Sequence, residues 1–230
     1  FVERLHGAVE LTTAQLLGAA TKQTEQRRVV ARHVAKPPVP DGRITLGEYG
    51  GAMAGSGMAY AYTHQRVRDD TLFLVAYDAR NLYVATVALQ PAAKDLTLFA
   101  KAHDDVSMFN DHDHIELMLD TNHDRNSFYQ VGWDYAGGKF DYAYHAPRQG
   151  RGWDPIWWVA TVVEEDAFIS EAVVPLAALG RTEPQAGEVW GFSIARLQSW
   201  KTGKQRHSIW ADYLRGDFLK PGLWGELTFE

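Results

Sequence analysis

The chain has 230 residues, of which 46% are hydrophobic and 23% charged, a composition typical of a globular protein that buries a core. Its formal net charge of −6 argues against nucleic acid and anionic membranes as partners, because phosphate binding requires a basic surface. It contains no cysteine, which excludes disulfides and thiolate metal sites, and no apolar run approaches the roughly 18 residues of a membrane span.

The N-terminal part of the sequence differs from the rest. Residues 8–26 carry leucines and alanines on one side behind a threonine cap, which predicts a short helix. Three prolines between residues 37 and 40 then interrupt any regular element. We therefore expect residues 1–36 to form a short helical extension or linker, and residues 37–230 to form the main domain.

The main domain is dominated by segments of period-two hydrophobicity, separated by turn residues such as Asn, Asp and Gly. About ten short strands at this spacing, with no long amphipathic helix between them, are typical of an antiparallel β-sandwich. A short helical turn is expected near residue 177. The predicted strands are 71–78, 81–89, 114–120, 127–135, 139–145, 157–164, 167–175, 191–200, 207–212 and 222–230.

Several short patterns occur in an order that resembles the family 9 carbohydrate-binding modules and their wider β-sandwich superfamily. The most specific is the strand that runs from Asp113 through Ile115-Glu116 to Asp120. The others are Asp41-Gly42 with Glu48-Tyr49, Asp78 with Leu82-Tyr83-Val84, Glu171-Ala172-Val173-Val174-Pro175, Gly191-Phe192-Ser193-Ile194, and Trp210 with Leu223-Trp224-Gly225. Together these patterns cover about residues 40 to 230.

The resemblance implies an all-β fold, namely an antiparallel, jelly-roll-like β-sandwich, and a function in holding a polysaccharide or oligosaccharide without catalysis. It also implies a structural calcium ion and a secreted or extracytoplasmic location. A protein of this kind is attached to, or acts beside, polysaccharide-processing enzymes, so we expect its partners to be a carbohydrate ligand and other domains of a larger extracellular protein.

The resemblance also indicates where a sugar would bind. In the family's sugar-binding members two tryptophan rings enclose the terminal sugar, and by this alignment the first position falls at Asn110, beside Phe109, and the second at Phe218. The family's polar contacts correspond to Glu116 and, in the last loop, Arg215. Neither of these two ring positions is a tryptophan in this chain. The resemblance therefore indicates where a sugar would bind, but not which sugar.

The segment between residues 153 and 158 is the densest aromatic cluster in the sequence. Trp153 or Trp157 could replace the missing platform; alternatively, the cluster only anchors the sandwich. Because successive strand residues point to opposite faces, we expect one of Trp157 and Trp158 to be buried and the other exposed.

Two loops rich in acidic residues, at 104–114 and 120–124, are candidates for metal binding. Calcium prefers carboxylate and carbonyl oxygens, which favours a structural calcium ion held by Asp120 or Asp124, whereas histidine favours zinc or iron. The spacing matches no established loop motif, so a solvated acidic loop is the alternative.

Three other functions remain open at this stage. A hydrolase would need a pair of carboxylates, and the sequence alone does not place Glu116 relative to Glu171 or Asp141. No serine-hydrolase, zinc-protease or phosphate-loop motif supports an enzyme. A haem b site, as in some sandwiches of the superfamily, would need a methionine and a histidine or lysine as axial ligands. A structural or interaction domain without sugar binding is the third alternative.

Overall fold

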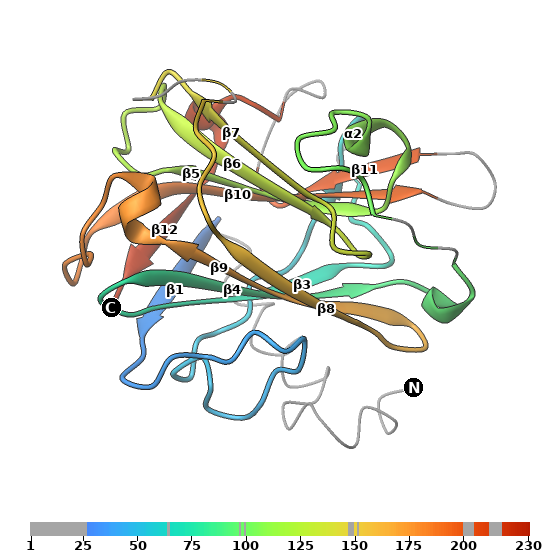
Figure 1. Ribbon diagram of the computed structural model, residues 1–230, viewed down its shortest axis with the longest axis horizontal. Coiled ribbons are helices and arrows are strands. Elements are labelled where there is room, and N and C mark those ends of the chain that lie inside the picture. Colours follow the sequence, from blue (N-terminus) through green and yellow to red (C-terminus); the bar gives the residue numbers. More distant parts are fainter. Residues whose placement is uncertain are drawn as a thin grey trace.

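Two β-sheets stack as layers in the protein, which we describe from a computed structural model (Figure 1). The structure describes residues 27–63, 65–96, 98, 100–146, 150, 152–199, 205–211 and 218–230. The helix predicted at residues 8–26 lies outside this part of the chain. Within the described residues, no helix has the length and apolar character needed to cross a membrane.

The first sheet forms the upper layer in Figure 1, and the second forms the lower layer. The first contains β2 (Ala59–Tyr60), β5 (His114–Asp120), β6 (Phe128–Asp134), β7 (Lys139–Tyr144), β10 (Val189–Ser199), β11 (Gln205–Ile209) and β12 (Gly225–Phe229). The second contains β3 (Thr71–Tyr77), β4 (Asn81–Leu89), β8 (Trp158–Val163) and β9 (Ala167–Pro175). The helical elements are short: η3 (Ala93–Asp95), α2 (Met108–Asp111), η4 (Leu176–Leu179) and η5 (Pro221–Leu223).

Strand β1 (Arg28–His33) joins the two sheets at one side of the sandwich. It pairs with β12 and with β3, and both pairings are parallel, whereas the other strand pairs are antiparallel. The predicted all-β sandwich is confirmed, with these two parallel pairs as the exception. Residues 28–33, which precede the predicted boundary at residue 37, pair with both sheets through their β-branched segment.

The hairpin between β3 and β4 forms although Ala79-Arg80 is not a favoured two-residue turn. Asp78 stabilises this turn, because its Oδ1 accepts hydrogen bonds from the backbone N–H groups of Arg80 (2.7 Å) and Asn81 (2.8 Å). Its Oδ2 accepts a bond from the Tyr83 hydroxyl (2.7 Å). An aspartate that bonds its own turn in this way replaces a glycine-dependent turn.

The main core lies between the sheets, where alternate residues of every long strand meet. Its largest side chains include Trp133, Trp190 and Trp210, all fully buried. A second cluster lies on the other face of the second sheet and is covered by the chain between residues 34 and 54. This sheet is therefore buried on both faces, which explains why every residue of β3 is buried.

A buried carboxylate holds that covering segment on the sheet. Glu171 of β9 accepts hydrogen bonds from the backbone N–H groups of Asp41 (3.1 Å), Gly42 (2.8 Å) and Arg43 (3.1 Å), and from the Tyr49 hydroxyl (2.9 Å). Burial, with some repulsion from Glu48, raises the pKa of Glu171 to about 7 despite these donors. Hydrogen bonds thus join two of the patterns that resemble the family: the one that contains Gly42 and Tyr49, and the one that begins at Glu171.

Candidate functional site

The outer face of the first sheet, which points away from the second sheet, carries most of the predicted site. In β5 the residues Ile115, Leu117 and Leu119 belong to the main core, so His114 and Glu116 point to the outer face. The register then places Gly132 of β6 and Ala195 of β10 on either side of Glu116. Glu116 itself is buried, between these two small neighbours.

A chain of polar side chains crosses this face from β7 to β5. The Tyr144 hydroxyl donates to Gln130 Oε1 (3.0 Å), and Gln130 Nε2 donates to Glu116 Oε2 (2.6 Å). Glu116 Oε1 lies 3.0 Å from His114 Nε2, whose ring is fixed by a 2.7 Å bond from Nδ1 to the His112 carbonyl oxygen. The carboxylate is therefore held from two sides and has a defined orientation.

Only part of the bonding capacity of Glu116 is used by these contacts. An ionised carboxylate offers about four lone-pair positions, and the two side-chain contacts occupy two of them. Burial raises the pKa of Tyr144 to about 12, with Tyr142 and Glu116 contributing, so its hydroxyl remains a donor at neutral pH. The outer face therefore carries a carboxylate acceptor, Glu116, and a phenol, Tyr144, both held by hydrogen bonds to Gln130.

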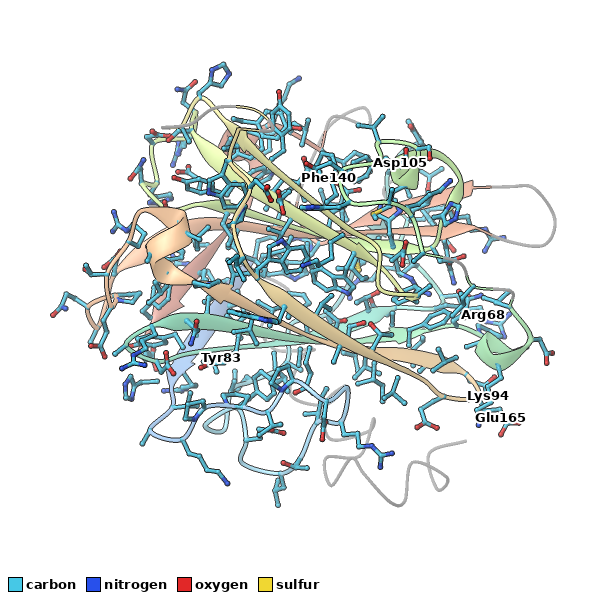
Figure 2. All side chains as sticks on the ribbon, in the orientation of Figure 1. Arg68, Tyr83, Lys94, Asp105, Phe140 and Glu165 are labelled. Atoms are coloured by element: carbon cyan, nitrogen blue, oxygen red, sulfur yellow. The ribbon has the colours of Figure 1, made fainter. Side chains whose placement is uncertain are left out.

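Phe109 lies across the same face from α2. Its ring contacts His114 edge-on at a centroid distance of 5.2 Å and Phe140 at 4.6 Å. A Cβ atom built on Gly132 would lie 3.7 Å from the Phe109 ring, so this ring passes directly over the glycine next to Glu116. Figure 2 labels Phe140, which comes from β7 in the upper layer, whereas the labelled Tyr83 lies in the lower layer. Phe109 and Glu116 both contact His114, so these two residues lie on the same face.

More rings continue along β6 and β7 to a hollow at the edge of the sheet. Phe128 stacks on Tyr144 at 4.2 Å, and Trp224 meets Phe128 edge-on at 4.9 Å. The hollow has a volume of about 430 Å³ and is lined by Phe128, Tyr144 and the polar residues Arg125, Asn126, His145 and Lys220, together with residues 219 and 221–223. It combines aromatic and hydrogen-bonding groups at the end of the polar chain.

Phe218 lies at another border of the outer face. Its ring is partly buried against a small cluster that includes Met118, Ala195 and Ile209, and its backbone oxygen accepts a bond from Trp224 Nε1 (3.0 Å). His207 of β11 lies between Phe218, at 5.7 Å, and the Glu116 region. Burial lowers the pKa of His207, although the Glu116 carboxylate acts in the opposite direction.

The four other predicted site residues have different outcomes. Asn110 is part of α2, and its side chain is not described. Arg215 lies outside the described residues. Trp153 and Trp157 are buried on the core side, where Trp153 donates to the Ala178 carbonyl oxygen (2.8 Å) and Trp157 donates to Asp141 Oδ1 (2.9 Å).

The structure therefore does not bring Trp153 or Trp157 to the sugar-binding position that was considered for them. Their rings pack on Tyr129 and Trp133, so the anchoring alternative describes their place correctly. The expectation that Trp157 and Trp158 face opposite ways is confirmed, because Trp157 is 1% exposed and Trp158 is 52% exposed. Trp158 belongs to the second sheet, away from Glu116.

Asp120 and Asp124 order the turn between β5 and β6. Asp120 accepts bonds from the N–H groups of Asp124 (3.2 Å) and Arg125 (2.8 Å), and burial raises its pKa. Asp124 accepts bonds from the N–H groups of Asn126 (2.8 Å) and Ser127 (2.7 Å) and from the Ser127 hydroxyl (2.6 Å). These donors already bond the oxygens that calcium would need, and the calcium ion stays a prediction.

The three carboxylates considered for hydrolysis lie in different parts of the sandwich. Glu116 is on the outer face of the first sheet, and Glu171 is on the outer face of the second. Asp141 is fully buried on the core side of β7, beside Trp157. Because two layers separate the glutamates, they do not form the facing pair that glycoside hydrolysis requires.

Sequence reasoning missed His114, Gln130 and Tyr144, which hold and extend the Glu116 site. His114 could have been found, since it is two residues from Glu116 and shares its face in a strand. Gln130 and Tyr144 depend on the register between β5, β6 and β7, which the sequence pattern does not give.

Comparisons with known proteins concern the sequence family and the fold. Residues 59–230 match a sequence model of the family described as carbohydrate family 9 binding domain-like. No curated protein matches the sequence.

Solved structures extend the similarity to most of the chain. A family 9 carbohydrate binding module from Caldicellulosiruptor kristjanssonii in complex with cellotriose has a TM-score of 0.64 and 19% identity, covering 88% of this chain and 93% of the other. A glucose complex from the same organism has a TM-score of 0.63 and 17% identity, covering 88% and 95%. A putative carbohydrate-binding protein from Bacteroides uniformis ATCC 8492 has a TM-score of 0.57 and 13% identity, covering 88% and 99%.

Proposed function

Since the chain belongs to the carbohydrate family 9 binding domain-like family, we propose that it binds a saccharide on the outer face of the first sheet, around Glu116. The observation that carries this proposal is the oriented Glu116 carboxylate between Phe109 on one side and the His207–Phe218 pair on the other. Similar structures hold cellotriose and glucose, so gluco-oligosaccharides are the first ligands to test.

Saccharide binding would use two different sides of the sugar, one apolar and one polar. A pyranose has an apolar C–H side, which an aromatic ring covers with a gain of roughly 25 cal/mol per Å² of apolar area removed from water. Its hydroxyls bond to charged or amide groups, and each bond to a charged group contributes about 1.5–3 kcal/mol. Glu116, Gln130 and Tyr144 supply such groups, already oriented by one another.

The proposal assigns binding rather than catalysis to this chain. It is supported by the separation of Glu116 from Glu171 and Asp141, which leaves Glu116 without an acidic partner among these candidates. A binding role is also consistent with the resemblance to modules that accompany polysaccharide-processing enzymes.

We expect glucose, cellobiose or cellotriose to bind in isothermal titration calorimetry, and substitution of the site to weaken that binding strongly. Phe218→Ala removes a ring at the border of the face, and Glu116→Gln keeps the shape of the side chain but removes its charge. Each change should reduce affinity at least tenfold, because a lost charged hydrogen bond or ring contact is worth about 1.5–3 kcal/mol.

Trp158→Ala is the matched control, since it removes an exposed ring from the other sheet and should leave affinity unchanged. Circular dichroism and thermal unfolding establish that each variant is folded. Binding that survives both site substitutions would show that the sugar is held elsewhere. A chain that binds none of a wide panel of glycans would overturn the proposed function in favour of a structural or interaction domain.

A further inference from the structure

We propose that His103, Asp141 and Asp154 form a site for a divalent transition-metal ion of the zinc type, on the core side of the edge strand β7. One potential ligand atom from each side chain lies within 4.8 Å of the other two. The three residues come from separate segments: the loop before α2, strand β7 and the loop before β8. This site is distinct from the predicted calcium residues Asp120 and Asp124 and from the proposed sugar site.

Asp141 provides the strongest indication of a missing partner. Its side chain is 0% exposed, and its Oδ1 accepts a bond from Trp157 Nε1 (2.9 Å) and lies 3.0 Å from His103 Nε2. Its Oδ2, in contrast, is buried and has no hydrogen-bond partner. A buried carboxylate oxygen without a partner is costly, and a bound cation would compensate for that cost.

The other two ligands reach the same place from solvent. His103 and Asp154 are both exposed, so two of the three potential ligands are accessible to an ion in solvent. Asp104 adds negative charge, because its Oδ1 lies 3.7 Å from His103 Nε2 and accepts a bond from the Asp141 N–H (3.1 Å). The nearby Lys139 ammonium is directed to the Trp157 carbonyl oxygen (3.0 Å).

The mixture of ligands favours a transition metal over calcium. Zinc is bound by histidine nitrogen and carboxylate oxygen at about 2.0–2.2 Å, and three protein ligands leave a fourth position for water. Calcium takes six to eight oxygens, and imidazole is not among its usual ligands. A metal would take the place of the direct contact between His103 Nε2 and Asp141 Oδ1, while the Trp157 bond would continue to orient the carboxylate.

Zinc chloride is the probe for this site, titrated calorimetrically into chelator-treated, tag-free protein. We expect one zinc ion per chain, a raised melting temperature with zinc, and little effect of calcium chloride. His103→Gln and Asp154→Asn should each reduce zinc affinity at least tenfold, because each removes one of three protein ligands. Both positions are exposed, so these variants should fold even if Asp141→Asn does not.

His33→Gln and Asp95→Asn are the matched controls, since they alter an exposed histidine beside Glu183 and an exposed aspartate at η3. Both should bind zinc as the unmodified chain does. The proposal would be overturned if the unmodified chain bound no zinc, or if His103→Gln and Asp154→Asn bound zinc as tightly as the unmodified chain does. Because the sugar titration uses other residues, its result is independent of this one.

Discussion

Replacing Glu171 by alanine is expected to lower the free energy of unfolding by about 3 kcal/mol, the largest change we foresee from a single polar side chain. The substitution leaves three backbone N–H groups, those of Asp41, Gly42 and Arg43, and the Tyr49 hydroxyl without their acceptor. An unsatisfied buried donor costs about 1–3 kcal/mol, and relaxation of the segment toward water recovers part of the sum. Urea unfolding followed by tryptophan fluorescence measures the change.

Glu165→Ala is the control, because Glu165 is an exposed glutamate at the turn between β8 and β9 and is labelled in Figure 2. It should change the free energy of unfolding by no more than about 0.5 kcal/mol. A Glu171→Ala variant as stable as this control would mean that the covering segment does not depend on the carboxylate.

The same network gives stability a defined pH dependence. Glu171 has a pKa of about 7 in the folded chain against an ordinary value of 4.5, so between these values the folded state binds a proton that the unfolded state does not. The contribution of this group is complete below pH 4.5 and is lost as the pH rises through 7, by roughly 3 kcal/mol in all. Glu171→Gln cannot titrate, so the unmodified chain should lose stability relative to this variant across that window. An unmodified chain that gains stability relative to Glu171→Gln as the pH rises would instead mean that the four donors outweigh burial.

Replacing Gly225 by alanine is expected to destabilise the fold by about 3 kcal/mol, through crowding rather than a lost bond. A Cβ atom at this position would overlap both the Arg27 carbonyl oxygen and the Trp210 ring. Neither can move easily, because the oxygen accepts the Glu226 N–H (2.9 Å) and the ring is enclosed by Phe73 and Phe192 at 5.4 and 5.7 Å. The melting temperature and the urea midpoint should both fall.

Gly222→Ala is the matched control three residues earlier, in η5. Its added Cβ would meet nothing closer than Arg125 Cβ at 4.0 Å, so the variant should be about as stable as the unmodified chain. Equal stability of the two alanine variants would show that Trp210 or β1 can shift to make room.

Most strands of the sandwich could be predicted because short segments of β-branched and aromatic residues are bounded by turn residues, even in β3, where both faces are buried. The hairpin at residue 78 also follows from local chemistry, since Asp78 bonds its own turn. Strand β1 could not be assigned to both sheets, because parallel pairing with β12 and β3 depends on residues far away in sequence. The β-branched residues of 28–33 favour a strand, but their sequence does not show which strands they pair with.

The site could be predicted only as far as single strands and family motifs allow. The alternation of β5 indicates the face to which Glu116 points, whereas the position of Phe109 over that face depends on how α2 packs. The same alternation indicates that Trp157 and Trp158 face opposite ways but does not say which one is buried. That outcome depends on Trp133 and Asp141 of neighbouring strands, which receive the Trp157 ring and its N–H.

The parallel pairing of β1 with β12 determines how the fold responds to mechanical tension. The two strands run in the same direction, with Glu226 donating to Arg27 at one end of the ladder (2.9 Å) and His33 donating to Glu230 at the other (2.9 Å). Tension applied between residues 27 and 230 pulls these neighbours along their lengths in opposite directions. The ladder bonds are then loaded in shear, all together, instead of being opened one after another from an end.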